Sequence, residues 1–84
     1  MRYRVLGYYP RVCVVIPTYN EVENIGRLLG ELREALESRS FNDFEVIVVD
    51  DDSPDGTWKV VLEESARDSR VKLVRRVGVR GLGS

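Results

Sequence analysis

Three consecutive aspartates, Asp50-Asp51-Asp52, are the residues of this sequence best suited to chemistry. They come directly after an apolar run, and like charges this close repel one another unless a positive or hydrogen-bonding partner meets them. A carboxylate there can accept hydrogen bonds from a ribose or a base amine, and it can help to hold a divalent cation. We expect Asp51 to bind a ligand, whereas Asp50 could instead lock neighbouring loops and Asp52 could cap the turn at 53–56.

A second polar cluster, Pro17-Thr18-Tyr19-Asn20-Glu21, follows an earlier apolar run. The Tyr19 ring could lie against a nucleobase, and Glu21 could accept a hydrogen bond from a base edge or a ribose. Each residue also has a purely structural alternative. Tyr19 could pack on the rim of a sheet, Glu21 could favour the positive end of a helix, and Pro17 could only stop the strand.

A third cluster is basic and consists of Arg75, Arg76 and Arg80, followed by a Gly-Leu-Gly sequence. Glycines let the backbone approach a phosphate, and arginines can bind it with paired hydrogen bonds. Residues 12–66 carry 4 basic and 13 acidic side chains, whereas residues 67–84 carry 6 basic and 1 acidic. Such a tail could face phosphate or an anionic membrane, or it could be an ordinary solvated surface.

Each cluster follows a segment whose composition predicts a strand. Strands are expected at Val12–Ile16, Phe44–Val49 and Val71–Val74, and the β-branched apolar runs are typical of strands buried on both faces of a parallel sheet. The only cysteine, Cys13, lies in the first of these runs, so we expect a buried and unreactive thiol.

Helical spacing of apolar residues separates the expected strands. One helix is predicted from about Glu21 to Glu37, with Asn20 as its N-cap and Glu23 completing a capping box. A shorter helix is predicted from Trp58 to about residue 66.

The resulting order, β-α-β-α-β, predicts an α/β fold with a parallel sheet and right-handed crossovers. Such a sheet binds ligands beyond the carboxyl ends of its strands, and all three polar clusters fall at those ends. Residues 1–11 show no clear period and are treated as a leader of uncertain structure.

Composition excludes several kinds of site. With no histidine and one cysteine, the chain has no internal disulfide, no structural zinc site and no histidine-based triad. A nucleotide fold of the Gly-x-Gly-x-x-Gly type is disfavoured, because no glycine occurs between the first strand and Gly26. No apolar run approaches the roughly 20 residues needed to span a bilayer, and no signal peptide is recognisable, so we expect a cytoplasmic location.

All three clusters carry a family resemblance. Val14–Glu21 followed by Asn24-Ile25 resembles the opening of family 2 glycosyltransferases, which have the Rossmann-like GT-A fold. Phe44–Thr57, with its Asp-Asp-Asp-Ser-Pro-Asp-Gly-Thr run, resembles the second motif of the dolichol-phosphate or polyprenyl-phosphate mannosyltransferases. The segment 76–83 is similar to the third motif of that subgroup, so the resemblance covers residues 12–84.

The resemblance implies a nucleotide-sugar donor such as GDP-mannose, a divalent cation (Mg²⁺ or Mn²⁺), and transfer of a hexose to a polyprenyl or dolichyl phosphate with inversion. It allows peripheral association with the cytoplasmic face of a membrane and implies no nucleic-acid partner. The residues expected at the donor are Pro17, Tyr19, Glu21, Val49, Asp51 and Arg80.

The family's metal-ligating Asp-x-Asp motif and its acceptor-binding region would lie downstream of Ser84. No catalytic residue and no metal ligand is therefore assigned, and residues 12–84 are expected to be the donor-binding part of a truncated family 2 domain, too short to complete the reaction alone.

Two alternative functions stay open. One is a non-catalytic nucleotide-binding or interaction module with an open sheet edge. The other is a phosphoacceptor domain of the response-regulator type, which is disfavoured because its later strand and lysine are not visible.

Overall fold

The computed structural model describes residues 3–7 and 11–78. Its elements, in chain order, are β1 (Arg4–Gly7), β2 (Val12–Thr18), α1 (Ile25–Ser38), β3 (Phe44–Asp50), α2 (Thr57–Arg67) and β4 (Val71–Arg75). None of the helices in these two ranges is long and apolar enough to cross a membrane.

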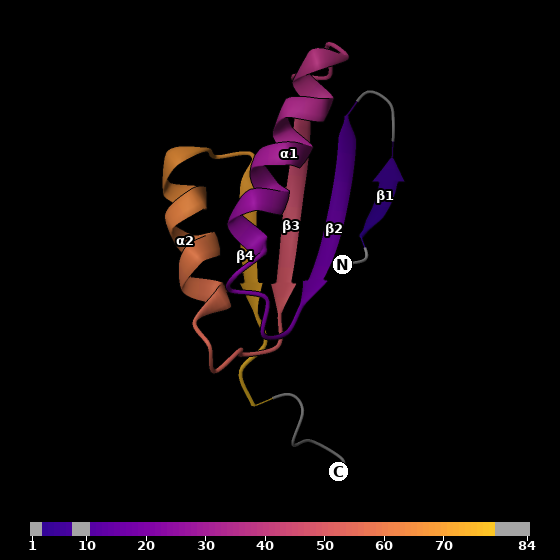
Figure 1. Ribbon diagram of the computed structural model, residues 1–84. Coiled ribbons are helices and arrows are strands. Elements are labelled where there is room, and N and C mark those ends of the chain that lie inside the picture. The colour runs from indigo at the N-terminus through magenta and orange to yellow at the C-terminus, as the bar shows by residue number, and fades with distance from the viewer. Residues whose placement is uncertain (1–2, 8–10, 79–84) are drawn as a thin grey trace.

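The four strands form one sheet in the order β1-β2-β3-β4. Strands β2, β3 and β4 run parallel, and β1 pairs with β2 in the antiparallel direction (Figure 1). Each parallel pair is joined by a helical crossover, as the apolar periodicity predicted. The predicted α/β fold with a parallel β-α-β-α-β unit is therefore confirmed.

Both helices cover the same face of the sheet (Figure 1). The side chains on that face are buried and form the core with α1 and α2: Val12, Val14, Ile16, Ile25, Leu29, Phe44, Val46, Val48, Val61 and Val71. The strand order explains this one-sided arrangement, because successive crossovers of one hand between neighbouring strands place their helices on one side.

The opposite face of the sheet has no helix over it in the described residues. Val15, Ile47 and Val49 on that face are half-buried, and Val74 is 47% exposed. The prediction that the strands are buried on both faces is therefore wrong. The prediction of a buried thiol is wrong for the same reason, since Cys13 lies on this face and is half-buried.

Strand β1 was not predicted, and it lies within the segment treated as a leader. Arg4 pairs with Val15 and Val5 pairs with Val14, and the register then shifts before Gly7. So short and irregular a strand shows no apolar alternation from which sequence patterns could identify it.

Helix α1 begins at Ile25, four residues later than predicted. Asn20 is not its N-cap but adopts a left-handed conformation with φ of 55°. The N-cap position belongs to Asn24, whose side chain makes no capping hydrogen bond. The backbone N–H of Asn20 instead donates to Ser53 Oγ at 2.9 Å, so a distant loop supplies the partner that the capping box was expected to provide.

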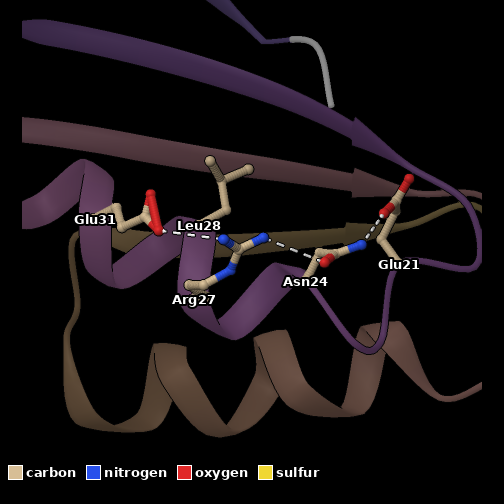
Figure 2. A pocket seen from close by; sticks show the side chains of 5 residues that line it. All are labelled: Glu21, Asn24, Arg27, Leu28 and Glu31. Atoms are coloured by element: carbon tan, nitrogen blue, oxygen red, sulfur yellow. Dashed lines mark hydrogen bonds and ion pairs between the residues drawn. The ribbon is translucent and has the colours of Figure 1, made fainter.

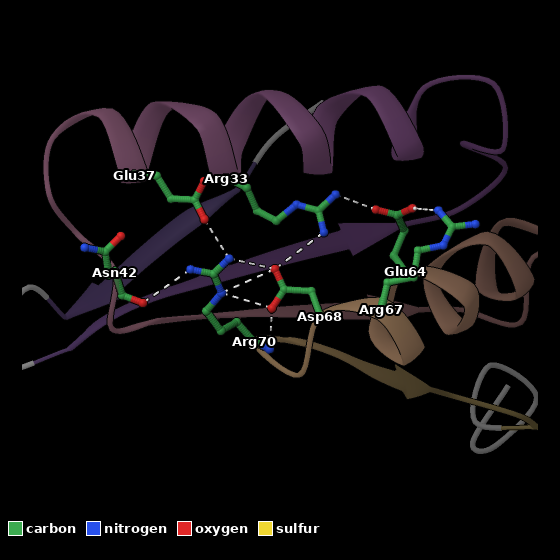
Figure 3. A network of polar contacts seen from close by, with 7 residues as sticks. All are labelled: Arg33, Glu37, Asn42, Glu64, Arg67, Asp68 and Arg70. Atoms are coloured by element: carbon green, nitrogen blue, oxygen red, sulfur yellow. Dashed lines mark hydrogen bonds and ion pairs between the residues drawn. The ribbon is translucent and has the colours of Figure 1, made fainter.

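A network of ion pairs joins the two helices to the start of β4, at the end of the sheet away from the polar clusters (Figure 3). Arg70 donates to Asp68 at 2.9 Å and to Glu37 on α1 at 2.7 Å. Arg33 on α1 donates to Glu64 on α2 at 2.7 Å and lies 3.5 Å from Asp68. The network fixes α1 against α2 and thereby the strands that carry the candidate site.

Candidate functional site

The parallel register brings the ends of three strands to one edge of the sheet. Thr18 at the end of β2 pairs with Asp50 at the end of β3, which pairs with Arg75 at the end of β4. The ladder continues past the strands, because the N–H of Asp51 donates to the Thr18 carbonyl at 3.2 Å and the N–H of Arg76 donates to the Asp50 carbonyl at 2.8 Å. We call this edge the carboxyl rim, defined by residues 17–21, 49–53 and 75–76.

The buried part of the carboxyl rim is a hydrogen-bond network around Asp50, whose side chain has no solvent exposure. Its carboxylate accepts from Thr18 Oγ1 at 2.6 Å, from Ser53 N–H at 2.8 Å and from Ser53 Oγ at 2.7 Å. These bonds replace the water that a buried carboxylate loses. Asp50 therefore locks the loop after β3 to the end of β2, which is the structural role left open for it by the sequence.

The loop before α2 also holds the loop before α1. Thr57 Oγ1 accepts from the N–H of Glu21 at 2.8 Å, and Asp55 Oδ2 accepts from the N–H of Val22 at 3.1 Å. Partial desolvation acts to raise the pKa of Asp55, but hydrogen bonds from Thr57 and Val22 outweigh it and hold that pKa below its ordinary value. Sequence reasoning missed Ser53, Asp55 and Thr57 as organisers of the rim, although Ser, Asp and Thr after a strand are typical loop-capping residues.

Asp51 presents the least satisfied carboxylate of the rim. Its Oδ1 is buried yet accepts no hydrogen bond from the described residues. Arg76 Nε lies 3.5 Å away, so the charge is partly balanced although no N–H is aimed at that oxygen. The side chain as a whole is 35% exposed, and this exposed surface belongs to atoms other than Oδ1. An unpartnered buried oxygen is unfavourable by about 1–3 kcal/mol, so a ligand hydroxyl or amine that donated there would be stabilised.

Three more of the residues predicted for the donor belong to the carboxyl rim: Pro17, Tyr19 and Val49. Pro17 and Val49 are direct partners between β2 and β3, on the face opposite the helices. Tyr19 follows β2 by one residue and is 44% exposed. Four of the residues predicted for the donor therefore share one edge of the sheet.

Glu21 lies at the start of the loop that leads to α1, and its carboxylate is engaged on that side (Figure 2). It accepts from Asn24 Nδ2 at 3.3 Å, while Arg27 donates to Asn24 Oδ1 at 3.3 Å and pairs with Glu31 at 3.7 Å. With Leu28 these side chains line a hollow of about 240 Å³. Glu21 thus reaches the rim through its backbone, while its side chain joins the polar cluster along α1.

Asp52 pairs with Arg75, and not with the following turn, which was the structural alternative that the sequence left open for it. Arg75 Nε and Nη2 lie 2.9 and 2.7 Å from Asp52 Oδ1, and the same guanidinium stacks 3.7 Å from the centroid of the Trp58 ring. Asp52 has a left-handed backbone, with φ of 54°, which costs a non-glycine residue about 1–2 kcal/mol. An exposed ion pair contributes about 0–1 kcal/mol and an exposed cation–π contact about 0.5–1 kcal/mol, so the two together offset that cost.

The described residues do not form a metal site. Within residues 3–7 and 11–78, no three acidic or cysteine side chains converge in a way that could hold a cation. The three consecutive aspartates diverge, since Asp50 turns inward to Thr18 and Ser53 while Asp52 turns to Arg75. Arg80, predicted to contact phosphate, lies outside the described residues, as does the Gly-Leu-Gly sequence after it.

The sequence of the chain is similar to those of glycosyltransferases. Residues 13–84 match the family described as glycosyl transferase family 2. The chain is 45% identical over 74 residues to a dolichol-phosphate mannosyltransferase of Pyrococcus furiosus, a match that covers 88% of this chain and 20% of the relative. It is 42% identical over 73 residues to an undecaprenyl-phosphate mannosyltransferase of Micrococcus luteus, covering 87% and 28%.

A third relative transfers a different sugar. The chain is 37% identical over 79 residues to a dolichyl-phosphate beta-glucosyltransferase of Mus musculus, covering 87% of this chain and 24% of the relative. The match therefore spans only 20–28% of the length of these relatives. No solved structure matches the chain at a significant level.

Proposed function

The chain belongs to glycosyltransferase family 2, and we propose that its carboxyl rim binds the nucleotide of a nucleotide-sugar donor. The observation that carries the proposal is the Asp51 carboxylate, whose buried Oδ1 accepts no hydrogen bond from residues 3–7 and 11–78 and lies at the edge where parallel sheets bind ligands. A ribose hydroxyl or a base amine would supply the missing donor. Tyr19, 44% exposed one residue beyond β2, is the aromatic side chain of the rim proposed to lie against the base.

We further propose that the donor serves transfer of a hexose to a polyprenyl phosphate. Support comes from the relatives, whose names specify dolichyl or undecaprenyl phosphate and either mannose or glucose. Mannose from GDP-mannose is the proposed case, given the two mannosyltransferase relatives. A phosphate acceptor is already anionic and needs little activation by a base, so positioning of donor and acceptor would dominate the rate.

This chain's part in that reaction is to bind and orient the donor. The Mg²⁺ or Mn²⁺ implied by the family resemblance belongs to the same proposal, and the described residues supply no ligand set for it. Peripheral association with the cytoplasmic face of a membrane is likewise proposed, because the named acceptors are lipids.

Calorimetric titration of the 84-residue chain with GDP tests the proposal, with circular dichroism to establish that the chain is folded. We expect saturable binding, and we expect Asp51→Asn to weaken it by about tenfold or more, because a hydrogen bond to a charged group contributes about 1.5–3 kcal/mol. Asp43→Asn is the matched control. That exposed aspartate precedes β3 at the opposite end of the sheet and pairs with Arg11.

Two results would count against nucleotide binding at the rim. One is a folded wild-type chain that shows no heat of binding at millimolar GDP. The other is an Asp51→Asn variant that binds GDP as tightly as the Asp43→Asn control. A parallel titration with UDP reports whether the rim prefers guanine.

A second candidate function is a non-catalytic interaction module. In the described sheet, β4 forms one edge, and Val74 on it and Val77 just after it are 47% and 59% exposed. An open strand edge can pair with another chain. Light scattering distinguishes the two functions, because a monomer at high concentration that still binds GDP contradicts the interaction module.

A further inference from the structure

Arg75 joins the carboxyl rim to helix α2 through two different kinds of contact. Its guanidinium stacks on the Trp58 ring at 3.7 Å from the ring centroid, and two of its nitrogens donate to one Asp52 oxygen at 2.9 and 2.7 Å. The Arg75 and Asp52 side chains are 37% and 36% exposed, so each contact alone is weak in water. The aromatic platform restrains the guanidinium in the plane from which both hydrogen bonds reach Asp52.

The backbone conformation of Asp52 constrains the direction of the neighbouring Asp51 side chain. The φ of 54° at Asp52 is left-handed, a conformation that turns the chain sharply directly after Asp51. On the other side, the N–H of Asp51 is held by the Thr18 carbonyl at 3.2 Å. Asp51 is therefore fixed between a ladder hydrogen bond and a left-handed residue that Arg75 restrains.

We propose that Arg75 is a positioning residue for the donor site, acting through Asp52 to aim the Asp51 carboxylate at the nucleotide. The inference rests on the proposed function, and it adds a specific claim. The contact unit formed by Trp58, Arg75 and Asp52 preorganises the rim before any ligand arrives. Arg75 itself touches the aspartate next to the proposed ligand contact and not the nucleotide.

The first test needs no nucleotide. Amide hydrogen exchange of the ligand-free chain, followed by NMR, measures how firmly the Asp51 N–H is held. We expect Arg75→Ala to speed exchange at Asp51 by roughly tenfold, because loss of the pairing frees a residue held in an unfavourable backbone region. Val48, in the buried part of β3, should exchange as slowly as in the wild type. Unchanged exchange at Asp51 overturns the inference whatever becomes of nucleotide binding.

The second test measures the affinity for GDP in variants that separate the positioning effect of the Arg75 guanidinium from the effect of its charge. We expect Arg75→Ala and Asp52→Asn each to weaken GDP binding by roughly tenfold, and Arg75→Lys to recover part of the loss because it keeps the charge without the planar fork. Lys59→Ala is the matched control, since Lys59 Nζ lies 5.4 Å from the centroid of the same ring.

Trp58 is the only tryptophan of the chain, so its fluorescence reports the contact directly. We expect Trp58 emission to change in Arg75→Ala, which removes the stacked guanidinium, and in Asp52→Asn, which removes the charged partner that holds it. GDP affinity in Arg75→Ala equal to that of Lys59→Ala, with a wild-type chain that binds GDP, overturns the positioning role and leaves the proposed function standing. A wild-type chain that is folded but binds no GDP overturns both the proposed function and the positioning role of Arg75.

Discussion

At Asp50 a fully buried carboxylate is stabilised by hydrogen bonds rather than by a cation. Its three donors come from Thr18 on the neighbouring strand and from Ser53 three residues on. Such a group is satisfied only when both loops adopt their native positions, so a single side chain couples the end of β2 to the turn before α2. The neighbouring Asp51 differs, because its Oδ1 accepts no hydrogen bond from the described residues.

Removal of the Asp50 carboxylate should therefore be strongly destabilising. Asp50→Ala leaves the two hydroxyls and one backbone N–H without their acceptor, and we expect the free energy of unfolding to fall by about 3 kcal/mol. Urea unfolding followed by circular dichroism measures it. Asp50→Asn, which keeps one acceptor oxygen, should lose less. A loss below about 0.5 kcal/mol for Asp50→Ala would contradict the role assigned to the network.

The sequence could predict which residue types lie at the carboxyl ends of the strands. Polar residues directly after apolar runs predicted that Asp51 and Tyr19 lie at one edge, because the ends of parallel strands must meet there, and the family resemblance added Pro17. The pairing of Asp52 with Arg75 could not be predicted. It depends on the left-handed backbone of Asp52 and on Arg75, which lies 23 positions away in the chain.

At the scale of the elements, the ion-pair network of Figure 3 fixes the helices at the end of the sheet away from the rim. A hydrogen bond from Arg70 holds the pKa of Asp68 at about 2, below its ordinary 3.8, against the opposing effect of burial. The same contact and the one to Glu37 raise the pKa of Arg70. Both shifts favour the charged pair in the folded chain.

Stability should consequently fall in acid within a defined range of pH. Because the folded pKa of Asp68 is depressed, its contribution is complete above about pH 4 and is lost as pH falls toward about 2. The shift corresponds to about 2 kcal/mol. We expect the free energy of unfolding to drop less between about pH 5 and about pH 2.5 in Asp68→Asn than in the wild type. Equal drops in the two proteins would show that the pair does not govern acid stability.

The strands were predictable because their β-branched runs are long and uninterrupted, whereas the start of α1 was not. The capping pattern at Asn20 and Glu23 is local, but the partners that hold this loop are Ser53 and Thr57, more than thirty positions later. Tertiary hydrogen bonds therefore replaced the local cap and moved the start of the helix to Ile25.

At the scale of the whole molecule, the sheet has one face packed against helices and one face without them in the described residues (Figure 1). Continuous apolar strands gave no sign of this asymmetry, because runs of this kind are typical of sheets covered on both sides. The asymmetry follows from the number and hand of the crossovers.

Neighbouring valines of β2 test this asymmetry. Val14 is 1% exposed beneath the helices, whereas Val15 is half-buried on the other face. We expect Val14→Ala to lower the free energy of unfolding by about 2 kcal/mol and Val15→Ala by less than about 1 kcal/mol, since only the first leaves a cavity in the core. Denaturant unfolding of the two variants measures the difference, and equal losses would contradict a one-sided core.

The central claim is that the carboxyl rim of this sheet binds a nucleotide. Two-dimensional NMR of the isotope-labelled chain during a GDP titration tests it most directly, because every amide reports its own surroundings. The account predicts saturable shifts concentrated at residues 17–21 and 49–53, with the amides around Asp43 and Arg70 unmoved. Shifts centred on that opposite end of the sheet, or none at all in a folded chain, would contradict it.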